Sequence, residues 1–247
     1  LQTGEPVFFF FYGRLLRITQ RKLSNTEVAE ILNLIYGPNG SAQILSGVDI
    51  DTHYEFRPNR NERYRFRVNA TGCLVAGHDA IQISFRTFPS TPPKMSDLNL
   101  EPQLVDALAP AQGIVYVTGA TGSGKTTLLA AIIRDLAEKT ESHRKILSYE
   151  APIEFVYDTI TMPSAIISQS EIPRHLPSFA AGVRNALRRK PRLILVGEAH
   201  DPETISASIE AALTGHPVYT TLHSNGVAET LRRLVNSFPA DEVKARM

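Results

Sequence analysis

The sequence has almost no cysteine, no tryptophan and almost no net charge. Cys73 is the single cysteine among 247 residues, which excludes an internal disulfide framework and a cysteine-rich zinc module. Lys and Arg total 26 against 25 Asp and Glu, a formal net charge of +1. No strong whole-molecule field therefore attracts the chain to nucleic acid or anionic lipid, although a local basic patch is still compatible with this balance.

Long apolar segments are also missing. A membrane helix requires roughly 18–20 consecutive apolar residues, and the run at 7–12 is far shorter. Residues 1–6 lack the basic and apolar stretches of a signal peptide. We therefore expect a soluble cytoplasmic protein without an integral membrane segment. Because the sequence does not start with Met and residues 244–247 read as the middle of a helix, we also expect a fragment of a longer chain.

What the sequence does contain is typical of a folded protein with one large domain or two modest ones. It is 43% hydrophobic and 21% charged, which excludes a disordered chain. Three prolines fall within Phe88–Lys94, and this stretch should be neither helical nor inside a sheet. We expect a stiff linker at 89–97, preceded by one domain at 1–88 and followed by a second at 98–247.

The first domain has an α+β pattern. Short apolar runs on either side of Gly13 predict a strand–turn–strand unit. Ser24 and Glu27 have the capping-box spacing that starts a helix, and that helix should stop before Gly37.

Two further segments of this domain, 64–68 and 81–86, alternate apolar and polar residues and predict strands with one apolar face. Arg63, Arg65 and Arg67 share the polar face of the first of them. The simplest interpretation is a solvated sheet face.

The second domain alternates apolar strands with helices. Strands are expected at 114–118, 145–149, 193–196 and 218–222. Helices are expected at 126–138, 179–189 and 202–213. Strands without polar alternation, separated by helices, indicate an α/β fold with a mostly parallel sheet covered on both faces.

The most specific motif lies between the first of these strands and the first helix. It matches the pattern G-x-x-x-x-G-K-[ST] with Gly119, Ala120, Thr121, Gly122, Ser123, Gly124, Lys125 and Thr126. Glycines let successive backbone N–H groups point at a triphosphate, and the helix start adds partial positive charge. Lys125 should reach the β/γ-phosphates and the Thr126 hydroxyl should ligate Mg²⁺, with Thr127 completing the binding loop. The expected cofactors are ATP or ADP and Mg²⁺.

Acidic and imidazole groups follow the other predicted strands. Glu150 and Glu154 follow the second strand, Glu198 the third and His223 the fourth. In an open parallel sheet, ligands bind at the carboxyl ends of the strands, so these groups should meet the phosphate loop. Taken singly, Glu150 also fits a solvated loop acid, Glu198 a charge at a helix start, and His223 a loop histidine.

Together these segments resemble the secretion-ATPase superfamily of type II and type IV secretion, type IV pili and conjugation. The resemblance covers the Walker A loop at 119–126, the Asp box at 148–154, the Walker B strand at 193–198 and the His box at 214–226. Residues 64–69 and 85–89 resemble the sheet and linker before the motor domain. Residues 59–79 and 214–238 are most similar to the DotB/TraJ-type ATPases of type IVB secretion and conjugation.

The resemblance implies a RecA-like P-loop ATPase domain preceded by a smaller PAS-like α+β domain, assembled as a homo-hexamer. It implies that an arginine of the first domain reaches the nucleotide of the neighbouring subunit. Arg86 matches that position best, and Arg65 and Arg67 match it less well.

For the catalytic positions, the resemblance implies that Glu154 is the general base, that Glu198 supports Mg²⁺ through water, and that His223 senses the γ-phosphate. Two positions depart from the family pattern. Ala151 replaces an aspartate in the Asp box, and His200 replaces an arginine after the Walker B strand. A histidine cannot make the bidentate, permanently charged contact of an arginine.

We therefore expect an Mg²⁺-dependent hexameric ATPase that powers type IVB-like secretion or conjugation, with inner-membrane components as partners and a peripheral location at that membrane. A pilus assembly or retraction motor is an alternative that the motor motifs do not separate. A nucleic-acid-translocating RecA-like ATPase is disfavoured by the balanced charge and the lack of tryptophan. A nucleotide-binding regulatory subunit is the fourth possibility.

Overall fold

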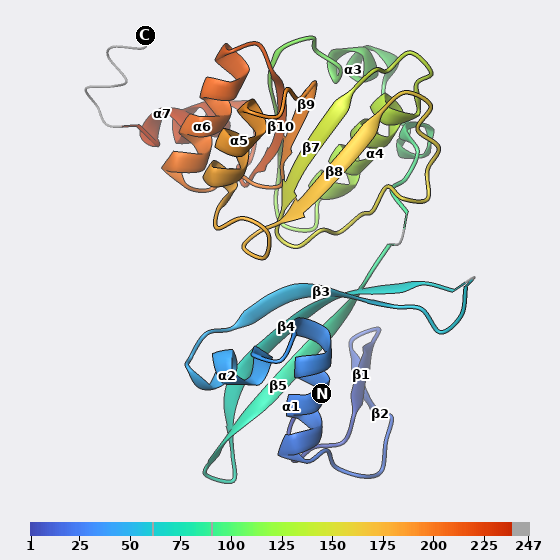
Figure 1. Ribbon diagram of the computed structural model, residues 1–247, viewed down its shortest axis with the longest axis vertical. Coiled ribbons are helices and arrows are strands. Elements are labelled where there is room, and N and C mark those ends of the chain that lie inside the picture. The colour runs from blue at the N-terminus through green and yellow to red at the C-terminus, as the bar shows by residue number, and fades with distance from the viewer. Residues whose placement is uncertain (61, 90, 239–247) are drawn as a thin grey trace. The chain divides into compact units, whose positions relative to one another are not determined.

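The chain forms two compact units, Leu1–Ser90 and Thr91–Met247. A computed structural model describes residues 1–60, 62–89 and 91–238 (Figure 1). The division falls within the proline-rich segment, and each unit has its own sheet and core.

The first unit is built from a hairpin, two helices and a three-stranded antiparallel sheet of order β3-β4-β5. Its elements are β1 (Phe8–Phe11), β2 (Arg14–Arg17), α1 (Asn25–Tyr36), α2 (Gly40–Leu45), β3 (Ile50–Phe56), β4 (Tyr64–Val75) and β5 (His78–Phe88). The predicted capping box is confirmed: Ser24 Oγ accepts from the Glu27 N–H, and the Glu27 carboxylate accepts from the Ser24 N–H. The predicted strand–turn–strand unit is the β1–β2 hairpin.

The interpretation of the arginines on β4 as a solvated face is wrong. Arg65 is only 2% exposed, and its Nε lies 3.7 Å from the carboxylate of Glu55. Arg63 pairs with the same carboxylate, and Arg67 pairs with Asp51 through two nitrogens. These arginines are paired because of the neighbouring strand β3, whose antiparallel register places Glu55 opposite Arg65.

The expectation that Phe88 lies outside the sheet is also wrong. Phe88 is the last residue of β5 and is paired with Arg65 of β4. Its ring centroid is 5.9 Å from the Arg65 guanidinium carbon, a distance at which a cation and an aromatic face attract one another. The aromatic ring therefore helps to bury the arginine.

The second unit contains a five-stranded parallel sheet of order β6-β10-β9-β7-β8. Before the sheet come a 3₁₀ turn (Met95–Leu98) and α3 (Pro102–Ala107). The remaining elements are β6 (Gly113–Thr118), α4 (Lys125–Glu138), β7 (Lys145–Glu150), β8 (Ile166–Glu171), α5 (Phe179–Leu187), β9 (Leu193–Val196), α6 (Pro202–Leu213), β10 (Pro217–Leu222) and α7 (Val227–Asn236). The predicted strands are β6, β7, β9 and β10, and the predicted helices are α4, α5 and α6.

Both faces of this sheet are covered, as an α/β fold requires. α4 contributes Leu129 and Ile133 to a core with Ile146 and Leu193 on one face. α5 and α6 pack on the other face around Tyr149 (Figure 1). The predicted fold class is therefore confirmed. Within the described residues, no helix combines the length and hydrophobicity that a membrane span requires.

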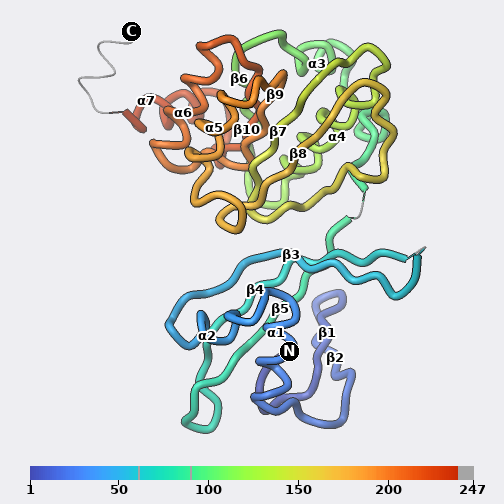
Figure 2. Tube along the Cα trace, viewed as in Figure 1, coloured from blue at the N-terminus to red at the C-terminus, as the bar shows by residue number. Residues whose placement is uncertain are grey.

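Sequence patterns did not predict the edge strand β8 or the helix α7. Between β7 and β8 the chain follows an irregular path through 151–165 (Figure 2). No regular strand–helix spacing therefore predicts where β8 begins. β8 itself, at the edge of the sheet, has only two apolar residues, Ile166 and Ile167, followed by four polar ones. α7 begins at Val227 after Gly226, which offers no side-chain cap.

Candidate functional site

The loop 119–124 connects β6 to α4 and curls back on itself through three glycines. Gly119, Gly122 and Gly124 have φ angles of 149°, 78° and 92°, a range that residues with a Cβ rarely adopt. At Gly119 a Cβ would also lie 2.7 Å from Ser123 Oγ. The sequence therefore needs glycine at this position for two independent reasons, conformation and close packing.

Lys125 is a buried cation at the start of α4. It is 9% exposed, and its Nζ donates to the carbonyls of Gly119 and Ala120, both at 2.9 Å. Within the described part of the chain no carboxylate pairs with it. The helix start has no side-chain cap and no acidic residue in its first turn, so its N–H groups and the ammonium together form an anion site.

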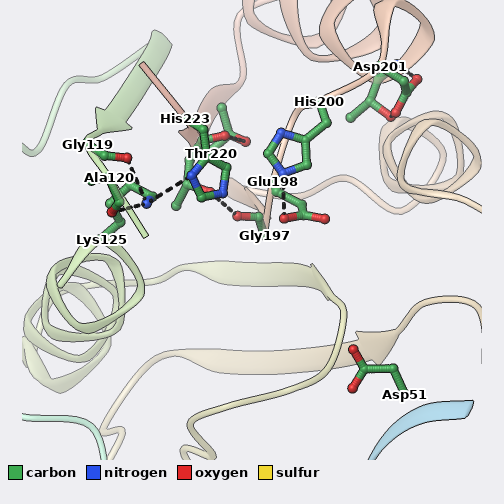
Figure 3. Close-up of polar contacts among 12 residues, drawn as sticks. Asp51, Gly119, Ala120, Lys125, Gly197, Glu198, His200, Asp201, Thr220 and His223 are labelled. Carbon is green, nitrogen blue, oxygen red and sulfur yellow. Dashed lines mark hydrogen bonds and ion pairs between the residues drawn. The ribbon is translucent and has the colours of Figure 1, made fainter. Parts of the chain in front are cut away.

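The strand order brings two further predicted residues to this loop. β10 lies between β6 and β9, so His223, just after β10, and Glu198, just after β9, reach the same edge. His223 Nδ1 is 3.5 Å from Lys125 Nζ. Figure 3 shows His223 between Lys125 and His200. The structure thus brings together Lys125, Glu198 and His223.

His200 joins this cluster, although the sequence marked it only as a departure from the family pattern. Its Nε2 lies 2.7 Å from Glu198 Oε2, and its ring stacks on that of His223 with centroids 4.9 Å apart. Burial lowers the pKa of His223, and the charges of Lys125 and His200 lower it further, against an opposite effect of Glu198. The lowered pKa favours the neutral form of the His223 imidazole.

Glu150 is a buried carboxylate, so its interpretation as a solvated loop acid is wrong. It is 7% exposed and accepts hydrogen bonds from Ser148 Oγ at 2.7 Å and Gln169 Nε2 at 3.0 Å. Together with Thr126 and Thr221 it lines a cavity of about 20 Å³, which is large enough for one water molecule. Its position at the end of β7 explains this burial, because every residue of that strand after Lys145 is buried.

Glu154 lies four residues further along, in the irregular segment after β7. It is half-buried and is not among the residues that line the cavity beside Thr126. The preceding residue, Ile153, donates its N–H to Glu171 Oε2 at 3.2 Å. The structure therefore places two glutamates near the end of β7, one facing the cavity and one beyond it.

A second, larger pocket lies next to the phosphate loop. Its volume is about 340 Å³. It is lined by Leu98, Leu100, Val117, Lys125, Thr127 and Leu128, among others. An apolar wall next to a phosphate loop suits the base or sugar of a nucleotide, and Thr127, expected in the binding loop, lies in this wall.

Residues 51–242 match the family described as "Type II/IV secretion system protein". The chain belongs to this family. The segment 119–126, which resembles a Walker A loop, is the curled loop before α4, and the strand that resembles Walker B is β9.

Among proteins of this family, the chain is 40% identical over 232 residues to a twitching motility protein of Neisseria gonorrhoeae, covering 94% of this chain and 58% of that protein. It is 42% identical over 242 residues to the type IV pilus retractation ATPase PilT of Pseudomonas aeruginosa, covering 98% and 67%. The chain thus spans about three fifths to two thirds of the length of these relatives.

Solved structures of secretion and pilus ATPases are also similar to this chain. The X-ray structure of the Legionella pneumophila ATPase DotB matches with a TM-score of 0.94 and 68% identity, over 100% of this chain and 66% of that one. The crystal structure of the pilus retraction motor PilT with bound ADP matches with a TM-score of 0.84 and 28% identity, over 99% and 68%. These matches confirm the expected RecA-like ATPase fold.

The residues of this family member suit Mg²⁺ as well as a nucleotide. Thr126 supplies a hydroxyl, and Glu150 and Glu198 supply carboxylates at the same sheet edge. These hard oxygen donors are what Mg²⁺ prefers, directly or through water. Of the two departures from the family pattern, Ala151 is exposed, so the missing carboxylate leaves no buried gap. His200, in contrast, enters the polar cluster itself.

Proposed function

We propose that the chain is the ATP-hydrolysing core of a hexameric, Mg²⁺-dependent motor for type IVB-like secretion or conjugative transfer. One observation carries the ATPase part: the buried Lys125 ammonium, at an uncapped helix start, lacks a carboxylate partner among the described residues. The 68% identity to DotB supports the type IVB assignment. Residues 98–247 are the ATPase domain, and 89–97 are the linker to the domain at 1–88.

In this proposal Lys125 binds the β/γ-phosphates, and the backbone N–H groups of 119–124 surround them. The Thr126 hydroxyl and, through water, the Glu198 carboxylate would hold Mg²⁺, which would supply positive charge next to the phosphates. Glu154 accepts a proton from the attacking water, while His223 contacts the γ-phosphate as a neutral imidazole. Glu150 lies where a single water fits beside Thr126, so it is a further acid available to orient that water.

Of the three candidate arginines, Arg86 is the one that we infer to serve a neighbouring subunit. Its side chain is exposed and forms no hydrogen bond or ion pair with another described residue. Arg67, its partner across β4 and β5, is held by Asp51, and Arg65 is buried. A free guanidinium is what an arginine finger supplied in trans requires.

Substitution of Lys125 tests nucleotide binding. We expect Lys125→Ala to weaken ATP binding about 30-fold or more, because losing one partner of a buried charge pair costs about 2–5 kcal/mol. Lys139→Ala is the matched control, since Lys139 pairs on the surface with Asp135. Titration with a fluorescent ATP analogue measures both. Equal affinities of Lys125→Ala and the parent protein would refute the phosphate site.

The machine that the motor serves is a separate question. The proposal names inner-membrane components of a secretion or conjugation apparatus as partners, at a peripheral cytoplasmic location. The 42% identity to PilT favours a pilus retraction motor as the second candidate. Co-purification from cross-linked cells of the source organism separates the two, because pilus proteins should be recovered with a pilus motor and secretion-channel proteins with a secretion motor.

A further inference from the structure

Three metal-ligating side chains meet beyond the ends of β9 and β10. Glu198, His200 and His223 each offer one ligand atom, and these atoms all lie within 4.8 Å of one another. This is the single group of three or more such residues found in 1–60, 62–89 and 91–238. Figure 3 shows the two imidazoles facing each other, with Glu198 beside His200.

The backbone that carries these side chains is held in place. The Ala199 N–H donates to the Thr221 carbonyl at 3.1 Å, and Thr221 Oγ1 donates to the Gly197 carbonyl at 2.7 Å. Arg233 Nη1 donates to the His223 carbonyl at 2.7 Å. Ligands on rigid, hydrogen-bonded segments lose little freedom when they bind a metal.

We propose that Glu198, His200 and His223 form a binding site for a zinc-class divalent cation, and that its occupation blocks ATP hydrolysis. Two imidazoles and a carboxylate, with one open position, are a ligand set that zinc uses. Mg²⁺ prefers oxygen ligands in an octahedron and does not suit this set. The site is therefore distinct in chemistry from the Mg²⁺ site expected at Thr126.

The distances are close to what a tetrahedral metal needs. Metal–ligand bonds of about 2.0–2.2 Å place the ligand atoms of a tetrahedron about 3.4 Å apart. Glu198 Oε2 and His200 Nε2, now hydrogen-bonded at 2.7 Å, need to separate by roughly 0.7 Å, and the remaining ligand atoms need to approach by at most roughly 1.4 Å from the 4.8 Å limit. Rotation of the side chains supplies that movement without a change of backbone.

Lys125 is the charge that opposes a cation here. Its Nζ is 3.5 Å from His223 Nδ1, at the outer limit of hydrogen bonding, whereas its two carbonyl partners are at 2.9 Å. It therefore keeps those partners when His223 turns to a metal. The nearby Asp201 carboxylate is already engaged with the N–H and hydroxyl of Thr204. The ammonium weakens metal binding but does not occupy the site.

The inhibition follows from shared residues and rests on the proposed ATPase function. Glu198 and His223 cannot hold a zinc-class cation and at the same time support Mg²⁺ and contact the γ-phosphate. The site depends on His200, where the family pattern has an arginine that cannot ligate a metal. The resulting sensitivity to zinc is thus a property of the histidine at this position.

Zinc binding is measured first without nucleotide, by competition with a chromophoric chelator. We expect one strong site per chain, and His200→Arg should weaken its affinity about tenfold or more. His143→Gln is the matched control, because His143 also contacts a glutamate, Glu141, at 2.9 Å but has no third ligand among the residues that the structure describes. Circular dichroism checks that both variants fold. Parental affinity in His200→Arg, or an equal loss in His143→Gln, overturns the site.

Two further measurements locate the metal and test its effect. Lys125→Ala should bind zinc more tightly, since an opposing charge is removed, and unchanged affinity would place the metal elsewhere.

Micromolar zinc should inhibit ATP turnover of the parent and of His143→Gln but not of His200→Arg. If zinc binds through His200 yet leaves turnover unchanged, the inhibitory role is refuted. If no variant hydrolyses ATP, the proposed function fails while the binding data still decide the metal site.

Discussion

At the scale of single residues, some features of the candidate site could be predicted from the sequence and others could not. Lys125, Glu198 and His223 were predicted to meet because each follows a strand of a parallel sheet, and strand ends share an edge. The burial of Glu150 and Arg65 was not predicted. Their partners, Gln169 and Glu55, come from neighbouring strands, and a pattern along one strand contains no information about the next.

The role of Glu154 is testable at this scale. We expect Glu154→Gln to keep ATP affinity, because the amide preserves shape, and to lower turnover by about 10²–10⁴, the usual contribution of a general base. Binding is measured with a fluorescent ATP analogue, and turnover as phosphate release. Glu150→Gln is assayed alongside it. Parental turnover in Glu154→Gln, with a loss in Glu150→Gln, would assign the base to Glu150 instead.

Among secondary-structure elements, those with local signals were predicted and those set by tertiary contacts were not. α1 was predicted from its start to its end because its capping box and the glycine after it are sequence features. β8 was missed because an edge strand has few apolar residues, and α7 because its helix start has no cap.

The cap of α1 gives a pH-dependent prediction. The Ser24 backbone N–H, followed by the Arg21 side chain, holds the pKa of Glu27 below its ordinary value of 4.5. The stabilisation is therefore present above about pH 4.5 and is lost as the pH falls through the lowered pKa. Between pH 6 and pH 3 the parent should lose more stability in urea unfolding than Glu27→Gln does. Glu30→Gln, on the same helix, controls for the lost charge, and identical slopes in all three proteins would contradict the prediction.

The β1–β2 hairpin differs from the other elements in being apolar yet exposed. Phe10 is 69% exposed, so Phe10→Ser should change the free energy of unfolding by no more than about 0.5 kcal/mol while raising solubility. Ile83→Ala, at a position 1% exposed, should cost about 2–5 kcal/mol. Chemical denaturation and light scattering measure the two effects. A large loss of stability in Phe10→Ser would show that this side chain is packed in solution.

At the scale of the whole molecule, the α/β fold class followed from the alternation of strands and helices. The order of the strands could not be predicted from the sequence, because the pairing of β10 with both β6 and β9 is a property of the assembled sheet. The cluster of His200 with His223 depends on that order, which is why the sequence singled out each residue for a different reason.

Assembly across subunits is tested by mixing inactive variants. Arg86→Ala and Lys125→Ala should each lose ATP turnover, but a mixture should regain part of it. A site then combines Lys125 from one subunit with Arg86 from its neighbour. Arg14→Ala serves as the control and should keep parental turnover, because Arg14 is another exposed arginine of the unit that contains Arg86. Absence of recovery on mixing, with both variants folded, would contradict a shared site.

The place of β6 in the sheet has a consequence for how the protein is made. β6 carries the phosphate loop, yet its partner strand is β10, about a hundred residues later. While the chain emerges from the ribosome, β6 has no strand beside it until residue 222 has been synthesised. Contacts this distant along the chain form slowly, so nascent chains that stop after β9 should not retain ATP, and the ability to do so should appear abruptly once β10 is released.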